Sequence, residues 1–226
     1  MVRKRLYLMR HGSVRYADSE GRPVHPDTVP LTPEGRAQAA RAREALRGVS
    51  LDRILCSGLR RTRETAEIVA GDSGVPLECE EAFEEIRPGH LAGLGPTELR
   101  DVFLAAMDDP QGPGDAFMRG ETWGEFEGRV RPAFRKLLAE PFTNALLVAH
   151  GGVNRILLLH ALGLGLESLG RLEQDPCALN IIDVLEDGRL QVRLLNQTLH
   201  DTGKDSLREG TMERLLRSFL PPETGP

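Results

Sequence analysis

The chain has 226 residues, of which 40% are hydrophobic and 28% are charged, which is typical of a globular protein with a sizeable core. Its formal net charge of -5 weighs against a nucleic-acid-binding protein, because such proteins usually carry a basic face. The basic N-terminus precedes an apolar run too short for a signal peptide, and no apolar stretch is long enough for a membrane helix. The three cysteines (Cys56, Cys79 and Cys177) favour a reduced, cytoplasmic protein without a structural disulfide.

Short apolar runs bounded by turn residues predict six strands. These cover residues 4–9, 51–56, 75–79, 144–149, 178–185 and 190–195. Helices are predicted over residues 33–47, 60–70, 97–107, 122–139, 153–162 and 208–220. Thr32 and Thr97 fit the N-cap position of the first and third helices, and Pro33 fits a first helical position. Within the fourth helix, Gly124, Gly128 and Pro132 weaken the prediction.

Strands that alternate with helices predict an α/β fold. We expect a three-layer sandwich, with a mostly parallel central sheet and helices on both faces. No repeat or low-complexity linker divides the chain, so residues 1–226 are expected to form one domain, with a disordered tail over about 221–226. Two Pro/Gly-rich loops, at 13–31 and 108–120, and the C-terminal helix are expected to shape a pocket.

Three of the predicted strands end in reactive or cationic residues. The first ends at Arg10 and His11, the second ends at Ser57 just before Arg61, and the fourth ends at His150. Ligands of α/β sheets bind beyond the carboxyl ends of the strands, and each of these ends is followed by a glycine or a helix start that offers N–H groups to an anion. This combination predicts a phosphate site.

Each piece alone has a simpler interpretation. Arg-His-Gly and His-Gly-Gly triplets arise by chance, the arginines around position 61 could form a solvated helix face, and Glu85 lies in an acidic stretch typical of a surface. The remaining histidines (His25, His90, His160 and His200) lack metal-ligand spacing, so we expect no metal site.

Taken in order, these motifs resemble the histidine phosphatase superfamily, which includes the cofactor-dependent phosphoglycerate mutases. The similar segments are 10–12, 31–39, 57–66, 85–86 with Gly89 and Gly93, 120–122 and 148–152. They run in the family's order from about residue 5 to residue 160.

The resemblance implies a phosphomonoesterase that forms a phosphohistidine on His11, with Glu85 as general acid and base. It implies phosphate binding by Arg10, Arg61, His150, Ser57 and Gly151. It also implies a small phosphate ester as substrate and no cofactor. The oligomeric state, monomer or homodimer, stays open.

The sequence departs from the family where substrates are selected. Val14 and Ala17 stand where many relatives carry a Ser or Thr and an Asn, and the segment 152–155 replaces the mutases' Asn-Ser. A phosphatase is therefore favoured over a mutase, and a non-catalytic phosphoryl-binding or interaction module ranks third. Arg15, Arg22 and Arg119 either bind a second anionic group or are ordinary surface residues.

Overall fold

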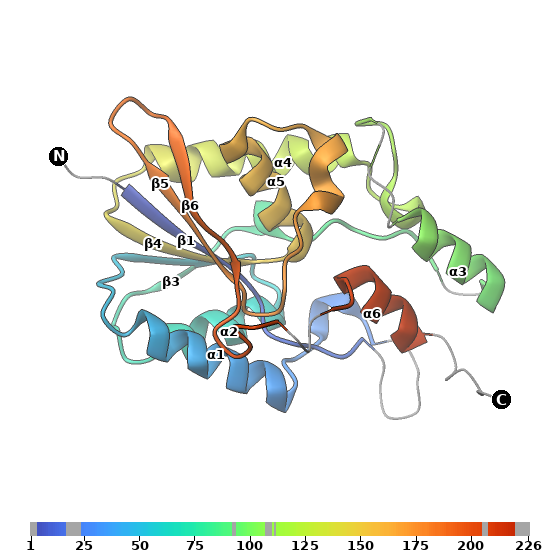
Figure 1. The fold of residues 1–226 in the computed structure, drawn as a ribbon, viewed down its shortest axis with the longest axis horizontal. Coiled ribbons are helices and arrows are strands. Elements are labelled where there is room, and N and C mark those ends of the chain that lie inside the picture. The colour runs from blue at the N-terminus through green and yellow to red at the C-terminus, as the bar shows by residue number, and fades with distance from the viewer. Residues whose placement is uncertain are drawn as a thin grey trace.

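The computed structural model describes residues 4–16, 24–91, 94–106, 110, 112–204 and 208–219. A six-stranded sheet lies between two helical layers, so the chain has the predicted three-layer α/β architecture (Figure 1). Ala17, Arg22 and the predicted disordered tail lie outside the described residues.

The sheet has the strand order β3-β2-β4-β1-β5-β6. The strands are β1 (Lys4–Arg10), β2 (Arg53–Cys56), β3 (Leu77–Cys79), β4 (Asn144–Ala149), β5 (Leu179–Val184) and β6 (Leu190–Gln197). The pairs β3-β2, β2-β4 and β4-β1 are parallel, whereas β5 is antiparallel to both β1 and β6. The sheet is therefore mixed and mostly parallel, and each predicted strand is confirmed with small shifts at its ends.

Six α-helices accompany these strands in the described part of the chain. They are α1 (Pro33–Leu46), α2 (Arg60–Ala70), α3 (Pro96–Ala105), α4 (Trp123–Ala139), α5 (Gly151–Leu162) and α6 (Thr211–Phe219). Short 3-10 turns lie at Pro26–Thr28, Glu81–Phe83, Phe117–Arg119 and Leu166–Arg171.

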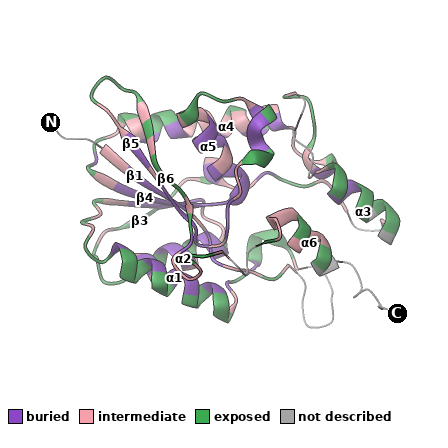
Figure 2. Ribbon diagram, viewed as in Figure 1, coloured by how far each residue is buried: buried purple, intermediate pink, exposed green. Residues whose placement is uncertain are grey.

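Alternation along β1 assigns the helices to the two faces of the sheet. Leu6 and Leu8 pack in one buried cluster with the apolar sides of α4 and α5. Tyr7 and Met9 point to the other face and pack in a second cluster with α1 and α2. The central strands are consequently buried on both sides, as Figure 2 shows.

The starts of α3, α5 and α6 differ from their predictions. Helix α6 begins at Thr211, three residues after its predicted start at 208. Thr97 is not the N-cap of α3, because Gly95 holds that position and Pro96 takes the first helical position, where its missing N–H costs nothing. The amide of Gly95 instead donates to a Glu98 carboxylate oxygen at 3.1 Å. Helix α5 begins at Gly151, two residues before its predicted start, directly after His150.

Helix α4 passes through Gly124, Gly128 and Pro132 without ending. Thr122 caps it, accepting from the amide of Glu125 at 3.2 Å. Tertiary packing explains why the weak positions are tolerated, because the buried side of α4 belongs to the larger core cluster.

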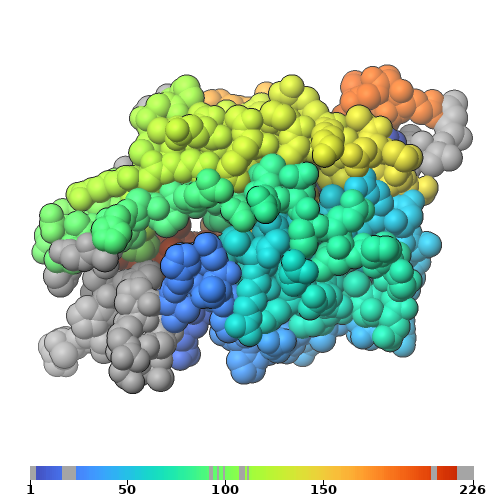
Figure 3. Space-filling view, turned by 180° about the vertical axis from the view of Figure 1, so that it is seen from behind, coloured from blue at the N-terminus to red at the C-terminus, as the bar shows by residue number. Residues whose placement is uncertain are grey.

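A third apolar cluster joins α3 and α6 at one end of the molecule (Figure 1). Val102 and Phe103 of α3 are buried there with Met118, and Met212 and Leu215 of α6 pack against them. From behind, a hollow is visible between the segment after β1, coloured blue, and the green segments that lead into and follow α3 (Figure 3). The two helices thus lie beside the edge where β1 and β4 end.

Candidate active site

The three predicted strand ends lie at one edge of the sheet. β1, β4 and β2 are parallel neighbours, so His11, His150 and Ser57 follow strands that end side by side. The amide of His11 donates to the Ala149 carbonyl at 3.0 Å. The two imidazole centroids lie 5.3 Å apart at an interplanar angle of 65°. The structure therefore brings together the residues that the sheet argument predicted to meet.

The ring of His11 is held so that one nitrogen keeps a lone pair. Its Nδ1 lies 2.8 Å from the Gly12 carbonyl oxygen, which can only accept, so Nδ1 carries the proton. The Nε2 atom is then unprotonated, and it accepts from Nε of Arg61 at 3.3 Å. Burial, followed by the charges of Arg61 and Arg10, holds the pKa of His11 well below its ordinary value of 6.5. His11 is thus a neutral imidazole with its lone pair directed at a cation.

Gly12 fits a tight backbone crossing next to this ring. A Cβ at position 12 would lie 2.5 Å from the Gly35 carbonyl oxygen, and a Cβ at position 35 would lie 2.2 Å from the Ser13 carbonyl oxygen. The amide of Gly12 also donates to the Thr65 hydroxyl at 3.1 Å. These contacts fix the turn after β1, and through the Gly12 carbonyl they fix the His11 tautomer.

Arg61 and Arg60, both in the first turn of α2, differ in burial. Arg61 is 2% exposed, and besides His11 its Nη1 contacts the Pro26 carbonyl oxygen at 2.6 Å. The side chain of Arg60 is 55% exposed and pairs with Glu64 at 2.8 Å. The arginine run is therefore partly a solvated face, with one member directed into the site.

Arg10 carries an unused donor. Its Nη1 donates to the Gln174 carbonyl at 2.6 Å and to the Thr211 hydroxyl at 3.0 Å, which links the end of β1 to α6. Its Nε is buried and has no hydrogen-bond partner among the described residues. This atom lies 3.7 Å from the place a Cβ would take on Gly151, so it faces the N-terminus of α5.

His150 also keeps one ring nitrogen free. Its Nε2 lies 2.8 Å from the Ser57 hydroxyl, which in turn lies 2.9 Å from the Thr62 hydroxyl. Its Nδ1 is buried without a partner in the described part of the chain. Burial, and then the charge of Arg61, hold the pKa of His150 well below 6.5. Ser57 therefore orients His150 here, rather than pointing its hydroxyl into open space.

The carboxylate of Glu85 contacts the start of α5 on the side opposite Arg10. One carboxylate oxygen accepts from the Gly152 amide at 3.1 Å, and the other accepts from the Ile86 amide at 3.1 Å. A Cβ on Gly152 would lie 2.5 Å from that second oxygen, Oε1. Glu85 Oε2 is also 3.8 Å from the Cβ position of Gly151, so this carboxylate and Arg10 flank the same helix start.

Arg129 of α4 anchors the segment that carries Glu85. It donates to three carbonyl oxygens in that segment, of Ala82 at 3.0 Å, Glu84 at 2.7 Å and Glu85 at 3.0 Å. Its remaining donors hold both carboxylate oxygens of Glu121, at 2.8 and 2.9 Å. Arg129 and Glu121 thus fix the backbone from which the Glu85 carboxylate projects.

Sequence reasoning did not single out Gly152 or Arg129 for the site. The Gly-Gly pair after His150 was the available signal for Gly152, and the segment 120–122 pointed to Glu121 without its partner. Arg155 was missed as well, although its Nη1 lies 3.7 Å from the Cβ position of Gly151, as close as Arg10. It is held by the Leu172 carbonyl at 2.5 Å and by Glu173 at 3.2 Å.

The described residues of the two predicted substrate loops lie at the surface or in local pairings. Arg15 and Arg119 are exposed. Val14 forms an isolated bridge with Leu31. No cluster of three or more metal-ligating side chains is found among the described residues, and none of their helices is long and apolar enough to cross a membrane.

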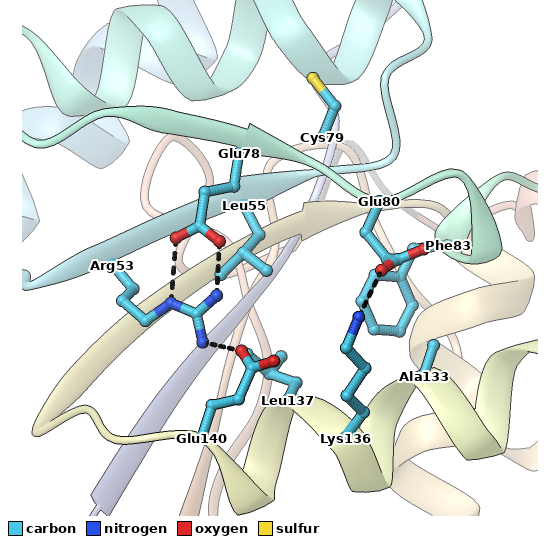
Figure 4. A pocket seen from close by; sticks show the side chains of 10 residues that line it. All are labelled: Arg53, Leu55, Glu78, Cys79, Glu80, Phe83, Ala133, Lys136, Leu137 and Glu140. Atoms are coloured by element: carbon cyan, nitrogen blue, oxygen red, sulfur yellow. Dashed lines mark hydrogen bonds and ion pairs between the residues drawn. The ribbon is translucent and has the colours of Figure 1, made fainter.

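A pocket away from these residues lies between the β2-β3 edge and α4 (Figure 4). Its charges are already paired, because Arg53 contacts Glu78 and Glu140, and Lys136 lies 3.9 Å from Glu80. It holds neither histidine nor any other predicted site residue. The candidate active site therefore remains the edge where β1, β4 and β2 end.

Two neutral, buried histidines lie among arginines at the carboxyl ends of parallel strands. Comparison with known proteins identifies the family of the chain. The model of the histidine phosphatase superfamily (branch 1) matches residues 6–198. The chain therefore belongs to the histidine phosphatase superfamily, as its motifs indicated.

The names of individual relatives describe different activities. The chain is 31% identical over 187 residues to the 2-carboxy-D-arabinitol-1-phosphatase of Triticum aestivum, covering 80% of this chain but 37% of that protein. It is 31% identical over 189 residues to a Salmonella choleraesuis protein named "Probable phosphoglycerate mutase GpmB", covering 80% of this chain and 85% of the relative. The chain spans less than half the length of the plant relatives it matches.

Among solved structures, the crystal structure of the alpha-ribazole phosphatase from Shigella flexneri superimposes with a TM-score of 0.71 at 29% identity. The match covers 85% of this chain and 96% of that one. The fold is therefore phosphoglycerate mutase-like, and the relatives that share it include both phosphatases and a protein named as a mutase.

Proposed function

We propose that the protein is a phosphomonoesterase that hydrolyses a small phosphate ester through a phosphohistidine on His11. The observation that carries the proposal is the state of the His11 ring. Its Nδ1 proton is committed to the Gly12 carbonyl, so the lone pair on Nε2 is the nucleophile. The depressed pKa keeps the ring neutral at physiological pH.

The phosphoryl group has complementary donors in this site. Arg61 already points Nε at His11 Nε2, and Arg10 Nε is a buried donor without a partner among the described residues. Buried donors are normally satisfied, so an anion that accepts from Arg10 is the simplest ligand. The N-terminus of α5, which starts at Gly151, adds backbone N–H groups and a favourable helix dipole.

The Thr62 hydroxyl donates to the Leu59 carbonyl, so Ser57 donates to Thr62 and accepts from Nε2 of His150. His150 Nδ1 therefore donates to a phosphoryl group once the ring takes up a second proton, which a bound anion favours.

In this mechanism Glu85 moves the proton. As Nε2 of His11 bonds to phosphorus, the bond from phosphorus to the ester oxygen breaks and the leaving oxygen takes the proton of the Glu85 carboxyl group. In the second step, water attacks phosphorus, the carboxylate of Glu85 takes its proton, and the bond to Nε2 breaks. His11 then returns to the neutral state, with phosphate released.

Hydrolysis is favoured over mutase chemistry by the residues around the site. Val14 replaces a pocket hydroxyl with an apolar side chain, and the segment 152–155 differs from the mutases' Asn-Ser. Because one relative is named as a probable phosphoglycerate mutase, mutase-type phosphoryl transfer is the alternative function. Transfer between the 2- and 3-positions of glycerate phosphate, measured in a coupled assay, decides between the two.

A panel of phosphate esters, assayed with the wild type and two variants, tests the proposal. His11→Ala should abolish release of phosphate from every ester that the wild type hydrolyses. His160→Gln is the matched control, because this histidine lies at the other end of α5 and packs edge to face against Phe134, away from the site. Comparable hydrolysis by His11→Ala and the wild type would contradict the proposal.

A further inference from the structure

Two cysteines that are far apart in the sequence end neighbouring strands. Cys56 is the last residue of β2 and Cys79 is the last residue of β3, and the two are direct partners in the parallel register. Their sulfur atoms lie 3.6 Å apart. Sequence spacing gave no sign of a pair, because 23 positions separate the two residues.

The backbone geometry suits a disulfide bond. Neighbouring strands lie about 4.8 Å apart, which falls within the Cα separations of about 4.4–6.8 Å that disulfides span. The sulfur atoms must approach by about 1.5 Å to reach the bonded distance of about 2.05 Å. That movement is within the range of side-chain rotation combined with a small shift of the strand ends.

The two thiols differ in access. Cys79 is exposed, and Nη2 of Arg63 donates to its sulfur at 3.2 Å. Figure 4 shows Cys79 pointing away from the pocket into which its neighbours Glu78 and Glu80 project. Cys56 is buried, and burial raises the pKa of its thiol. Cys79 is thus the thiol that an oxidant reaches first, with Cys56 behind it.

The pair is joined directly to the candidate active site. Ser57 follows Cys56 in the chain, and its hydroxyl holds Nε2 of His150 at 2.8 Å. Movement of Cys56 toward β3 pulls the backbone of Ser57 in the same direction. The orientation of His150 therefore depends on the position of a residue next to a potential disulfide.

We infer that Cys56 and Cys79 form a reversible disulfide on exposure to a peroxide, and that this modification lowers activity by displacing Ser57 from His150. The sulfur of Cys79 attacks one peroxide oxygen, the O–O bond breaks, and the departing hydroxide takes the thiol proton as water. The sulfur of Cys56 then attacks the sulfenic acid, the S–O bond breaks, and the second hydroxide leaves as water with the Cys56 proton. Two thiols are oxidised and one peroxide is reduced to two waters.

The test uses the full chain, reduced, desalted and then exposed to hydrogen peroxide. Denatured protein is labelled with N-ethylmaleimide and mapped by mass spectrometry. We expect a mass loss of two hydrogen atoms, no label on Cys56 or Cys79, and full label on Cys177. Hydrolysis of an aryl phosphate should fall about tenfold, as expected for loss of one buried hydrogen bond, and should recover with dithiothreitol.

Variants separate this mechanism from general oxidative damage. Cys79→Ser and Cys56→Ser should each keep basal activity and resist peroxide, whereas Cys177→Ala should still respond. Equal inactivation of Cys79→Ser and the wild type would overturn the inference. So would a disulfide-linked dimer, a sulfinic acid on Cys79, or a Cys56–Cys79 disulfide that leaves turnover unchanged. The labelling result stands even if no phosphatase activity is found, so failure of the proposed function is recognised separately.

Discussion

Gly152→Ala tests the contact between Glu85 and the start of α5. In the native chain the Gly152 amide donates to Oε2 of Glu85. Because glycine has no side chain, nothing at position 152 crowds the other carboxylate oxygen, Oε1. An added Cβ would lie 2.5 Å from Oε1 and 3.3 Å from the carboxylate carbon. The clash involves the end of a side chain rather than backbone, so the variant should fold with Glu85 displaced.

The expected loss of activity follows from that displacement. Restoring an ordinary contact of about 3.4 Å moves the carboxylate by about 1 Å, and misplacement by that distance costs about 10²-fold in rate. This lies at the lower end of the roughly 10²- to 10⁴-fold contribution of general acid catalysis. Stability should change little, because alanine is favoured over glycine in a helix by about 1 kcal/mol, which offsets the crowding.

The assay compares an alkyl phosphate with p-nitrophenyl phosphate. The alkoxide leaving group needs the proton of Glu85, so kcat should fall about 10²-fold, whereas the nitrophenolate needs little assistance and its kcat should fall much less. Gly128→Ala in α4 is the matched control, because its added Cβ meets nothing within 4 Å. If Gly152→Ala turned over the alkyl ester like the wild type, the assignment of Glu85 as the general acid would be wrong.

Three further predictions follow from the same site. Arg61→Gln should lower kcat/KM about 10²- to 10³-fold, whereas Arg60→Gln, which removes an exposed guanidinium, should be nearly neutral; equal effects of the two would contradict the orientation of Arg61. Glu121→Gln should lower kcat about tenfold with little change in KM, because Arg129, which holds the backbone of Glu85, loses a charged partner while the phosphate donors stay in place. A change confined to KM would contradict this role of Glu121. The free energy of unfolding should fall as the pH drops below about 6.5, by up to about 1.4 kcal/mol per pH unit for each of His11 and His150, because the unfolded chain takes up protons that the buried neutral rings refuse. Denaturant titrations between about pH 5 and 7 measure that slope, and a flat profile would show that the rings are charged in the folded state.

Features that depend on local sequence were predictable. Apolar runs locate β1 and β4, and the rule that ligands bind beyond the carboxyl ends of parallel strands predicts that His11 and His150 lie together. The N-cap of α1 could be read from Thr32 followed by Pro33.

Features that depend on long-range contacts were not predictable. Arg129 reaches the Glu85 backbone across 44 positions, and Cys56 meets Cys79 through strand pairing, so spacing alone contains neither contact. Thr97 is not the N-cap of α3. Proline fits the first helical position, so Pro96 begins the helix and the residue before it, Gly95, is the N-cap. No composition rule distinguishes Arg60 from Arg61; the family resemblance selects Arg61, and in the structure Arg61 is buried whereas Arg60 is exposed.

The central claim is that phosphorus bonds to Nε2 of His11 during turnover. Rapid acid-free quenching with a phosphate-labelled ester, followed by peptide mapping, measures it directly. We predict label on the peptide that contains His11, stable to alkali and lost in acid, and absent from His11→Ala while His160→Gln labels like the wild type. Turnover at the normal rate with no label on His11 under any quench time would contradict the account.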